Sequence, residues 1–384
     1  MENNSESSNL TDYRCAMSMM SNSRGKAYIC IISEFAPMTV WFDRYVTIFW
    51  YCVGITGNSL TIKIWSRRVS RTNISALYLI VLAFTDLFYL FLHVIQELKF
   101  AWGVPSIDIA GWCQVYFVFY MFAMYMSPFL ILGFTIERFL SIKTPFKSQR
   151  FSVTNRGPLE ISGITMLALL LAIPQIFSWE VQQGECQGPH HDFYAVWSWI
   201  SDTLVFVIFP VTSLVLNSLV MKAASKADKK RQSTLPLCRR KSTPDKSAHQ
   251  TKIKHSPSTL TLLCVSFYRI ITVIPVTIAF ALQGEFKPGS LKLSLTEMKN
   301  DDVWTDHFVW YRAKKAVDEI GLSQYSCNIF IYLITATHFR HEMKRLFYFV
   351  PFMRPDAGFS DSFNRTSIEL SFLRNKSKDK TYHL

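Results

Sequence analysis

The chain has 384 residues, of which 49% are hydrophobic, 15% aromatic and only 18% charged. A soluble globular domain usually has fewer aromatic and more charged residues, so lipid is the expected solvent. The formal net charge of +13 does not indicate nucleic-acid binding, because the basic residues lie between apolar blocks and form no single face or tract.

Seven apolar blocks follow one another along the chain, each close to the roughly 20 residues that a helix needs to cross a bilayer. In chain order they cover residues 45–62, 72–96, 109–136, 161–179, 203–221, 256–284 and 320–339. Asp86 interrupts the second block and Arg269 the sixth, whereas the other blocks carry no charged residue. The pattern predicts an all-α membrane protein, a bundle of seven transmembrane helices.

The rest of the chain divides around these blocks. We expect an N-terminal tail over residues 1–42, the helix bundle over 43–337, a short amphipathic eighth helix over 338–350 and a C-terminal tail over 351–384. The first eleven residues are polar and acidic, so no cleavable signal peptide is visible, and the first helix would itself direct insertion.

Loop charge predicts the orientation. Lys and Arg are abundant in the first, third and fifth connections, above all in residues 222–256, and absent from residues 180–194 in the fourth connection. Since short basic loops stay in the cytoplasm, the N-terminus is expected outside the cell at the plasma membrane. The Asn-x-Ser/Thr sequons at Asn3 and Asn9 agree with that orientation and are candidate glycosylation sites.

Four cysteines fall on the predicted outer side, in an oxidising compartment. They are Cys15, Cys30, Cys113 and Cys186. Two disulfides are possible there, with three alternative pairings.

Isolated polar residues inside membrane helices are costly and tend to face the bundle interior. Here they form a series: Gly57-Asn58 in the first helix, Asp86 in the second, Glu137-Arg138-Phe139 at the end of the third with Pro145-Phe146 after it, and Asn328 and Tyr332 in the seventh. In this order and on these helices, they resemble the rhodopsin-like (class A) family of G-protein-coupled receptors over about residues 40–350.

The resemblance assigns roles to these residues. It implies a buried polar network of Asn58, Asp86, Asn328 and Tyr332, a cytoplasmic switch residue in Arg138, and a heterotrimeric G protein as partner. Phe146 would be an apolar plug for that partner or a simple interfacial anchor.

The resemblance also bears on the outer cysteines. It implies a disulfide between Cys113 and Cys186, which leaves Cys15 with Cys30 as either a second bridge or two thiols paired in some other way.

The chain departs from the family's pattern at several places. Ile329 replaces the proline of the seventh helix, Ser218 a tyrosine of the fifth, Val273 the aromatic switch residue of the sixth, and His255 the acidic partner of the third-helix arginine. Normal switching is therefore open to question.

The ligand is expected to be a peptide. The positions of the family's amine-binding aspartate and retinal-binding lysine are Tyr120 and Leu322 here, so neither amines nor retinal are favoured. Acidic residues on the predicted outer surface would attract a basic, neuropeptide-like ligand, although such loops can also be merely solvated. The candidate ligand-binding residues are Gln96, Glu97, Tyr120, Asp318 and Glu319.

Arg269 is an unusual charge in the middle of the sixth helix, about one and a half turns inward of Pro275. In the resembled family this position faces the core near Asp86, Ser127 and Asn328, where a sodium ion binds. We predict that Arg269 joins the buried polar network as a built-in counter-charge to Asp86. The alternative is an arginine on a lipid-exposed face.

The cytoplasmic segments suggest regulation. Arg239-Arg240-Lys241-Ser242 resembles a basophilic kinase site, so Ser242 is a candidate phosphorylation site. A phosphorylated Ser-rich tail could be read by an arrestin. The alternative is a tail that is only disordered.

The sequence also bears on other classes of protein. The sequence has no nucleophile-and-base pair, phosphate loop or metal-ligand spacing, so we expect no enzyme, cofactor or metal site. A chemosensory seven-helix ion channel, a transporter, or a receptor-like protein that binds ligand without G-protein signalling remain alternatives.

Overall fold

The computed structural model describes residues 24–67, 74–143, 153–188, 192–233 and 257–348. The chain falls into two units, residues 1–339 and 340–384. The helix bundle and all of the contacts discussed below belong to the first unit.

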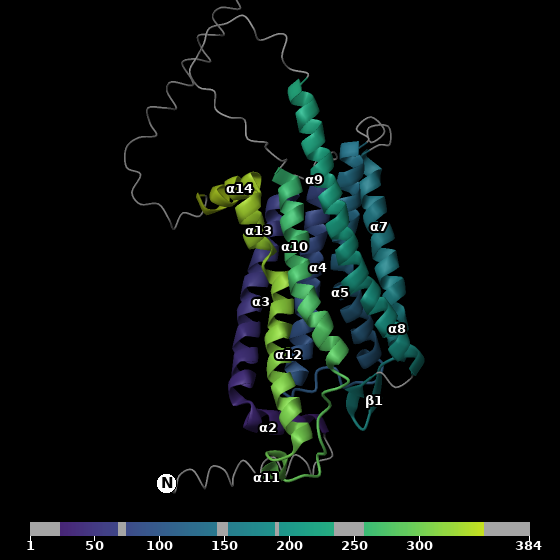
Figure 1. The fold of residues 1–384 in the computed structure, drawn as a ribbon, viewed down its shortest axis with the longest axis vertical. Coiled ribbons are helices and arrows are strands. Elements are labelled where there is room, and N and C mark those ends of the chain that lie inside the picture. The colour runs from purple at the N-terminus through teal and green to yellow at the C-terminus, as the bar shows by residue number, and fades with distance from the viewer. Residues whose placement is uncertain (1–23, 68–73, 144–152, 189–191, 234–256, 349–384) are drawn as a thin grey trace, which may run out of the picture. The chain divides into compact units, whose positions relative to one another are not determined.

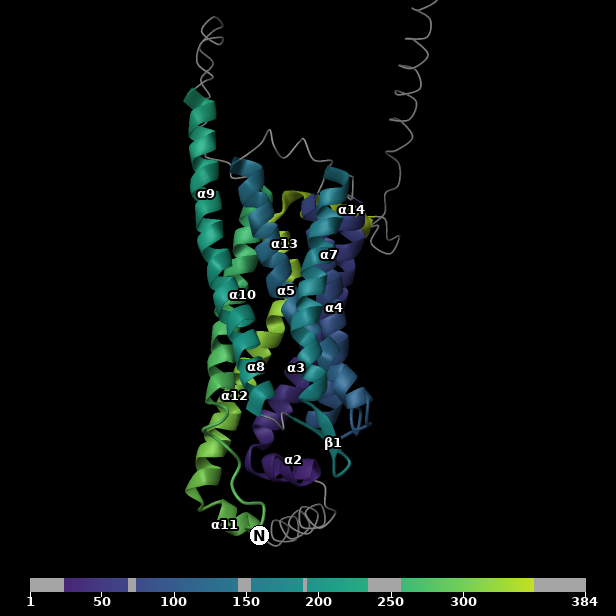
Figure 2. The same cartoon turned by 90° about the vertical axis from the view of Figure 1, so that its right-hand side faces the viewer.

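The long helices run side by side (Figures 1 and 2). They are α3 (Pro37–Ser66), α4 (Ile74–Phe100), α5 (Trp112–Lys143), α7 (Val153–Ala172), α9 (Phe209–Ser233), α10 (Pro257–Leu282) and α12 (Asp302–Ser326). Helix α3 packs on α4, α4 on α5, α5 on α7 and α9, α9 on α10, α10 on α12, and α12 returns to α3. The described helices thus form a closed bundle.

Shorter elements extend or connect these helices. They are α2 (Arg24–Phe35), the 3₁₀ turn η1 (Ile173–Phe177), strands β1 (Glu180–Gln182) and β2 (Glu185–Gln187), α8 (Asp192–Thr203), the π-helical η2 (Leu204–Ile208), α11 (Leu295–Met298), α13 (Asn328–Thr335) and α14 (Thr337–Tyr348). Helix α8 continues through η2 into α9, and α12 is followed by α13. The described residues therefore contain the seven rods that the apolar blocks predict.

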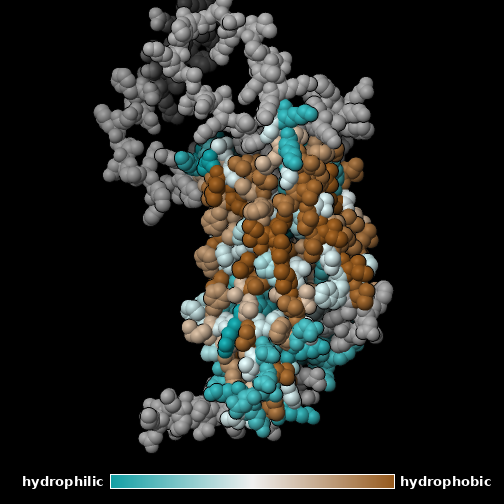
Figure 3. All heavy atoms as spheres, in the orientation of Figure 1, coloured by the Kyte–Doolittle hydropathy of each residue, from teal (hydrophilic) through white to brown (hydrophobic). Residues whose placement is uncertain are grey.

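The outside of the bundle is apolar where lipid would contact it. A broad hydrophobic surface covers the middle of the helices in Figure 3, with hydrophilic residues towards the end that carries α11. Five described stretches are long and apolar enough to cross a membrane: Ile74–Phe100, Trp112–Leu140, Arg156–Phe177, Val196–Ala223 and Leu263–Leu282. Helices α3 and α12 are not among them, because these two helices carry the polar side chains described below.

The seventh helix begins much earlier than the charge-free block 320–339 predicts. Helix α12 starts at Asp302, and the Asp301 side chain caps it by accepting a hydrogen bond from the Trp304 backbone N–H at 2.9 Å. A carboxylate at this position satisfies a free backbone donor and favours the positive end of the helix dipole. The absence of charged residues did not mark the start of this helix, because the outer half of α12 directs charged side chains into protein contacts.

The predicted N-terminal tail contains a helix. Ile31 and Ile32 of α2 are buried against Met298, Trp304 and Phe308, at the outer end of α12. The Tyr28 hydroxyl lies 2.9 Å from His307 Nε2, and burial raises the pKa of Tyr28, so its hydroxyl stays protonated and can donate. Helix α2 therefore packs across the same end of the bundle as α11 (Figures 1 and 2).

The loop containing α11 is built locally. The Ser294 hydroxyl accepts from the Glu297 backbone, and the Glu297 carboxylate accepts from the Ser294 backbone, which is a capping box. The backbone N–H and hydroxyl of Ser294 hold the pKa of the exposed Glu297 carboxyl below its usual range.

The predicted disulfide is confirmed. Cys113, at the start of α5, is bonded to Cys186 in β2, which pairs antiparallel with β1 through a turn in which Gln183 and Gly184 adopt positive φ. This bond ties the hairpin to the outer end of α5. Cys30 is also disulfide-bonded, whereas its candidate partner Cys15 lies outside the described residues.

The break between α12 and α13 needs no proline. It lies at Cys327, whose backbone N–H bonds to the Ser323 carbonyl. Ile329, in place of the family's proline, packs where a Cβ on Gly57 would come within 2.9 Å of it. The missing side chain at Gly57 therefore lets α13 approach α3 closely.

Candidate functional site

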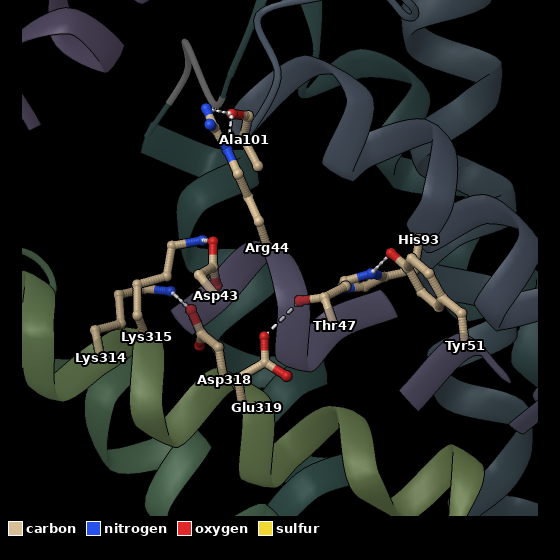
Figure 4. Close-up of polar contacts among 10 residues, drawn as sticks. All are labelled: Asp43, Arg44, Thr47, Tyr51, His93, Ala101, Lys314, Lys315, Asp318 and Glu319. Atoms are coloured by element: carbon tan, nitrogen blue, oxygen red, sulfur yellow. Dashed lines mark hydrogen bonds and ion pairs between the residues drawn. The ribbon is translucent and has the colours of Figure 1, made fainter. Parts of the chain in front are cut away.

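Two groups of buried polar side chains occupy the bundle, one near its outer end and one at mid-depth. The outer polar cluster consists of Asp43, Thr47, Glu97, Lys315 and Glu319, from α3, α4 and α12. Figure 4 shows how the members on α3 and α12 face one another across the two helices.

An ion pair joins α3 to α12 in the outer polar cluster. Lys315 Nζ lies 2.8 Å from Asp43 Oδ2, and the two side chains are 18% and 6% exposed. Pairs shielded from water are screened little by salt, so this contact holds the outer ends of the two helices together.

Glu319 has only one of its carboxyl oxygens satisfied. The Thr47 hydroxyl donates to Glu319 Oε1 at 2.5 Å, whereas the buried Oε2 has no hydrogen-bond partner among the described residues. The residue is 5% exposed. A buried carboxylate oxygen without a donor is costly, so this atom marks an incomplete contact.

Glu97 adds a third carboxyl group to the outer polar cluster. Its charged neighbours are Lys315, Asp43 and Asp318, and its buried Oε1 atom also lacks a hydrogen-bond partner. Two carboxyl groups so close together can both stay charged only beside a cation; otherwise one of them binds a proton.

The other candidate ligand residues lie around the outer polar cluster. Asp318 is half-buried and pairs with Lys314 at 2.5 Å, one helical turn away. Gln96 has a buried Oε1 without a partner. Tyr120 is buried among aromatic rings, with its hydroxyl 3.1 Å from that of Tyr89.

Sequence reasoning missed two members of the cluster that carry charge. Asp43 lies at the boundary of the predicted helix domain, and Lys315 lies outside the predicted seventh span. A signal was available: acids and lysines recur at residues 314, 315, 318 and 319, which is the three- and four-residue spacing of one helical face.

The buried polar network centres on Asp86, which is fully buried. The Ser127 hydroxyl donates to Oδ1 at 3.0 Å, and the Asn328 amide donates to Oδ2 at 2.7 Å. Both oxygens of Asp86 therefore have a donor, from α5 and from α13.

Arg269 of α10 reaches the same carboxylate. Its Nη2 lies 4.0 Å from Asp86 Oδ1, and its guanidinium carbon lies 5.3 Å from the centre of the Tyr325 ring. The side chain is 5% exposed, and neither terminal nitrogen has a hydrogen-bond partner among the described residues. Charge attraction and the aromatic face are thus its stabilising contacts.

The remaining members of the buried polar network hold neighbouring helices together. The Asn58 amide donates to the Tyr325 carbonyl at 2.8 Å, which joins α3 to α12. Tyr332 of α13 is 1% exposed, with its ring 5.6 Å from that of Phe339. All six predicted residues are buried in the bundle core.

The cytoplasmic end of α5 carries the predicted switch residues. Arg138 Nε lies 3.3 Å from Glu137 Oε2, and the guanidinium carbon lies 5.5 Å from the centre of the Phe134 ring. Phe139 follows on the same helix. Pro145, Phe146, Ser242, Asn3 and Asn9 lie outside the described residues, as does His255.

No three His, Cys, Asp or Glu side chains in the described part of the chain are close enough to hold a metal ion.

Comparison with known proteins shows the family of the chain. The model of the rhodopsin family of seven-transmembrane receptors matches residues 57–310, more than half of the chain. Leukotriene B4 receptor 1 of Homo sapiens is 28% identical over 144 residues, 35% of this chain and 39% of the relative. Neurotensin receptor type 1 of Mus musculus is 28% identical over 184 residues, 44% and 43% of the two chains.

Cephalotocin receptor 1 of Octopus vulgaris is 25% identical over 173 residues, 41% of this chain and 43% of the relative. The chain thus spans less than half the length of these curated relatives. The family match ends within α12, before Asn328 and Tyr332.

Proposed function

Because the chain belongs to the rhodopsin family of seven-transmembrane receptors, multi-pass membrane proteins of the cell surface and not enzymes, we propose that it transmits the binding of an extracellular ligand to a heterotrimeric G protein. A ligand that binds one bundle arrangement more tightly than another shifts the population of the two arrangements. The cytoplasmic half then exposes a groove for a helix of the G protein.

Arg138 carries this proposal. It lies at the cytoplasmic end of α5, held by its neighbour Glu137 and by the ring of Phe134. An arginine held by a single ion pair can exchange that partner for a carbonyl or carboxylate of an incoming helix.

The test is Arg138→Ala, with surface expression retained. We expect it to abolish agonist-driven nucleotide exchange on the G protein. Arg156→Ala is the matched control, because Arg156 also forms an ion pair at this end of the bundle, with Glu160 one turn along α7 at 2.7 Å. Intact exchange in Arg138→Ala would sink the proposal.

A basic peptide is the proposed ligand. The acidic residues of the outer polar cluster support it, because negative charge attracts and orients cationic groups. The relatives' names include receptors for peptides, neurotensin and cephalotocin, and for a lipid, leukotriene B4. Charge favours the peptide over the lipid.

Glu97→Gln tests this choice of ligand. It removes a carboxylate charge at constant shape, so the potency of a basic peptide agonist should fall. Glu180→Gln on β1 is the control. An unchanged potency for Glu97→Gln would show that Glu97 does not contact the basic peptide.

Arg269 is proposed as the internal counter-ion of Asp86, in the place that a bound cation would otherwise occupy. The 4.0 Å separation and the burial of both side chains support this role. Because Arg269 comes from α10 and Asp86 from α4, the pair also couples the positions of these two helices. A change in that coupling would accompany any movement of α10.

A receptor that binds ligand without G-protein signalling is the second candidate. The departures at Ile329 and Val273 favour it, because both lie where the family places switching residues. Absence of nucleotide exchange in the wild type with any agonist that binds would select this alternative.

Regulation by phosphorylation is part of the proposal. A phosphate on Ser242 or on the Ser-rich tail would add dense negative charge that an arrestin could read. Phosphopeptide mapping after stimulation tests it, and an unmodified loop and tail would count against it.

A further inference from the structure

We propose that the outer polar cluster is a subsite for one organic cation, a guanidinium or alkylammonium group, which Glu319 contacts directly. The proposal deepens the ligand class given above and rests on the receptor function only for the source of the ligand. It requires that the outer polar cluster lack at least one positive charge and that its free atoms be acceptors.

Charge balance is the first argument. The outer polar cluster contains three carboxyl groups, those of Asp43, Glu97 and Glu319, and one ammonium group, that of Lys315, which pairs with Asp43 at 2.8 Å. In the described part of the chain, neither Glu97 nor Glu319 forms a salt bridge. With all three acids ionised, the single ammonium group that they share leaves two negative charges unbalanced.

Nearby basic residues are already engaged. Lys314 pairs with Asp318 at 2.5 Å. Arg44 donates two hydrogen bonds to the Ala101 carbonyl, at 2.6 and 3.1 Å (Figure 4). Its guanidinium carbon also lies 4.7 Å from the centre of the Trp102 ring. Neither side chain can neutralise Glu319 without giving up those contacts.

The unsatisfied atoms are the second, independent argument. Glu319 Oε2 is buried without a hydrogen-bond partner, in a residue that is 5% exposed. The Oε1 atoms of the half-buried Glu97 and Gln96 are also buried without a partner among the described residues. All three atoms are acceptors. A complementary group must therefore bring several N–H donors and no lone pair, which describes ammonium and guanidinium groups.

The surroundings favour an organic cation. Tyr51 lies among the same acids, and its hydroxyl is fixed 2.7 Å from His93 Nδ1. Lys315 Nζ already lies 6.0 Å from the centre of the Tyr311 ring. Aromatic faces beside carboxylates stabilise delocalised cations, guanidinium above all.

The probe pair is n-butylguanidinium and n-butylurea, which share shape and differ in charge. The measurement is thermal unfolding of the purified full-length receptor at constant ionic strength. We expect butylguanidinium to raise the unfolding temperature in a saturable manner and butylurea to leave it unchanged, because only ligands that bind the folded state stabilise it.

Two variants, one inside the outer polar cluster and one outside it, identify the carboxyl group that contacts the cation. Glu319→Gln should raise the half-saturating concentration of butylguanidinium at least about tenfold, the loss expected for one charge-assisted contact. Glu180→Gln, the matched control with the same chemical change, should change it less than about twofold, because Glu180 is exposed on β1 outside the outer polar cluster. If Glu319→Gln is not recovered as folded protein, Glu97→Gln replaces it with the same expectation.

Three results would overturn the proposal: equal responses of Glu319→Gln and Glu180→Gln, equal effects of the two compounds, or no effect of butylguanidinium on the wild type. The readout contains no G protein, so these results leave the Arg138 test untouched. A receptor without nucleotide exchange could still pass this test.

Discussion

The outer polar cluster and the buried polar network both hold carboxyl groups away from water, but they differ in how those groups are compensated. In the buried polar network, both oxygens of Asp86 have donors and Arg269 supplies the one positive charge. In the outer polar cluster, three carboxyl groups share Lys315, and the buried Glu319 Oε2 has no donor in the described residues. The two groups therefore differ in which atoms are left without a hydrogen-bond partner: guanidinium donors of Arg269 in the buried polar network, and carboxyl acceptors in the outer polar cluster.

The largest effect is expected from removing Arg269. Arg269→Leu leaves Asp86 uncompensated in the core, which costs about 3–5 kcal/mol in measured buried pairs. We expect low surface expression and a lower unfolding temperature. Asp86→Asn added to Arg269→Leu should partly restore both, because the double variant contains no unpaired charge.

A double-mutant cycle on unfolding free energy measures this coupling. Strict additivity of the two changes would show that the pair does not exist as a functional contact.

The corresponding change in the outer polar cluster should cost less. Lys315→Met removes the one cation there, and we expect a loss of about 2 kcal/mol, below the range for fully buried pairs because the Lys315 side chain is 18% exposed. Asp43→Asn should rescue it in part. Lys314→Met, one residue away in a half-exposed pair, should cost less than about 1 kcal/mol.

Chemical denaturation of the three variants checks the order of these losses. Equal losses for the two lysine variants would contradict the comparison, because the outer polar cluster would then be no more shielded than the surface.

A smaller effect is expected where only a neutral donor is lost. Thr47→Val leaves Glu319 Oε1 without its hydrogen bond and should lower the unfolding free energy by about 1–2 kcal/mol. Thr56→Val is the control on the same helix, because the exposed Thr56 hydroxyl bonds only to the carbonyls of its own helix. Similar values for both variants would mean that Thr47 does not hold Glu319.

The smallest expected effect is that of sodium. With Arg269 beside Asp86, exchange of sodium for choline should leave the unfolding temperature and agonist affinity of the wild type unchanged. Arg269→Leu should gain a dependence on sodium, because Asp86 then needs another cation. A strong sodium effect on the wild type would place Arg269 away from Asp86.

Some features were readable in the sequence because they depend on the local environment of each residue. The seven apolar blocks predicted all seven rods, since a helix in lipid must be apolar outside, although the seventh block covers only the inner half of its rod. Cys113 and Cys186 were paired through the family resemblance, and the structure has this disulfide. The pairing of Arg269 with Asp86 was predicted from its depth in the sixth helix together with the family resemblance, which places this position near Asp86.

Other features escaped sequence reasoning because they depend on which helices are neighbours. The outer half of α12 lies outside the predicted seventh span, because its charged residues interrupt the apolar pattern. That charge is tolerated only through contacts with α3 and α4. The docking of α2 on Trp304 and Phe308 joins segments more than 250 residues apart, with no local pattern in the tail.

The sequence by itself therefore determined the number of rods, their orientation and the presence of charges at depth, because these follow from the cost of polar groups in lipid. Tertiary structure alone decided which charges meet in the outer polar cluster. Asp43 and Lys315 lie 272 residues apart in the chain and 2.8 Å apart in space. A charge pattern cannot reveal an unpaired acid such as Glu319, because pairing is a property of the packed helices.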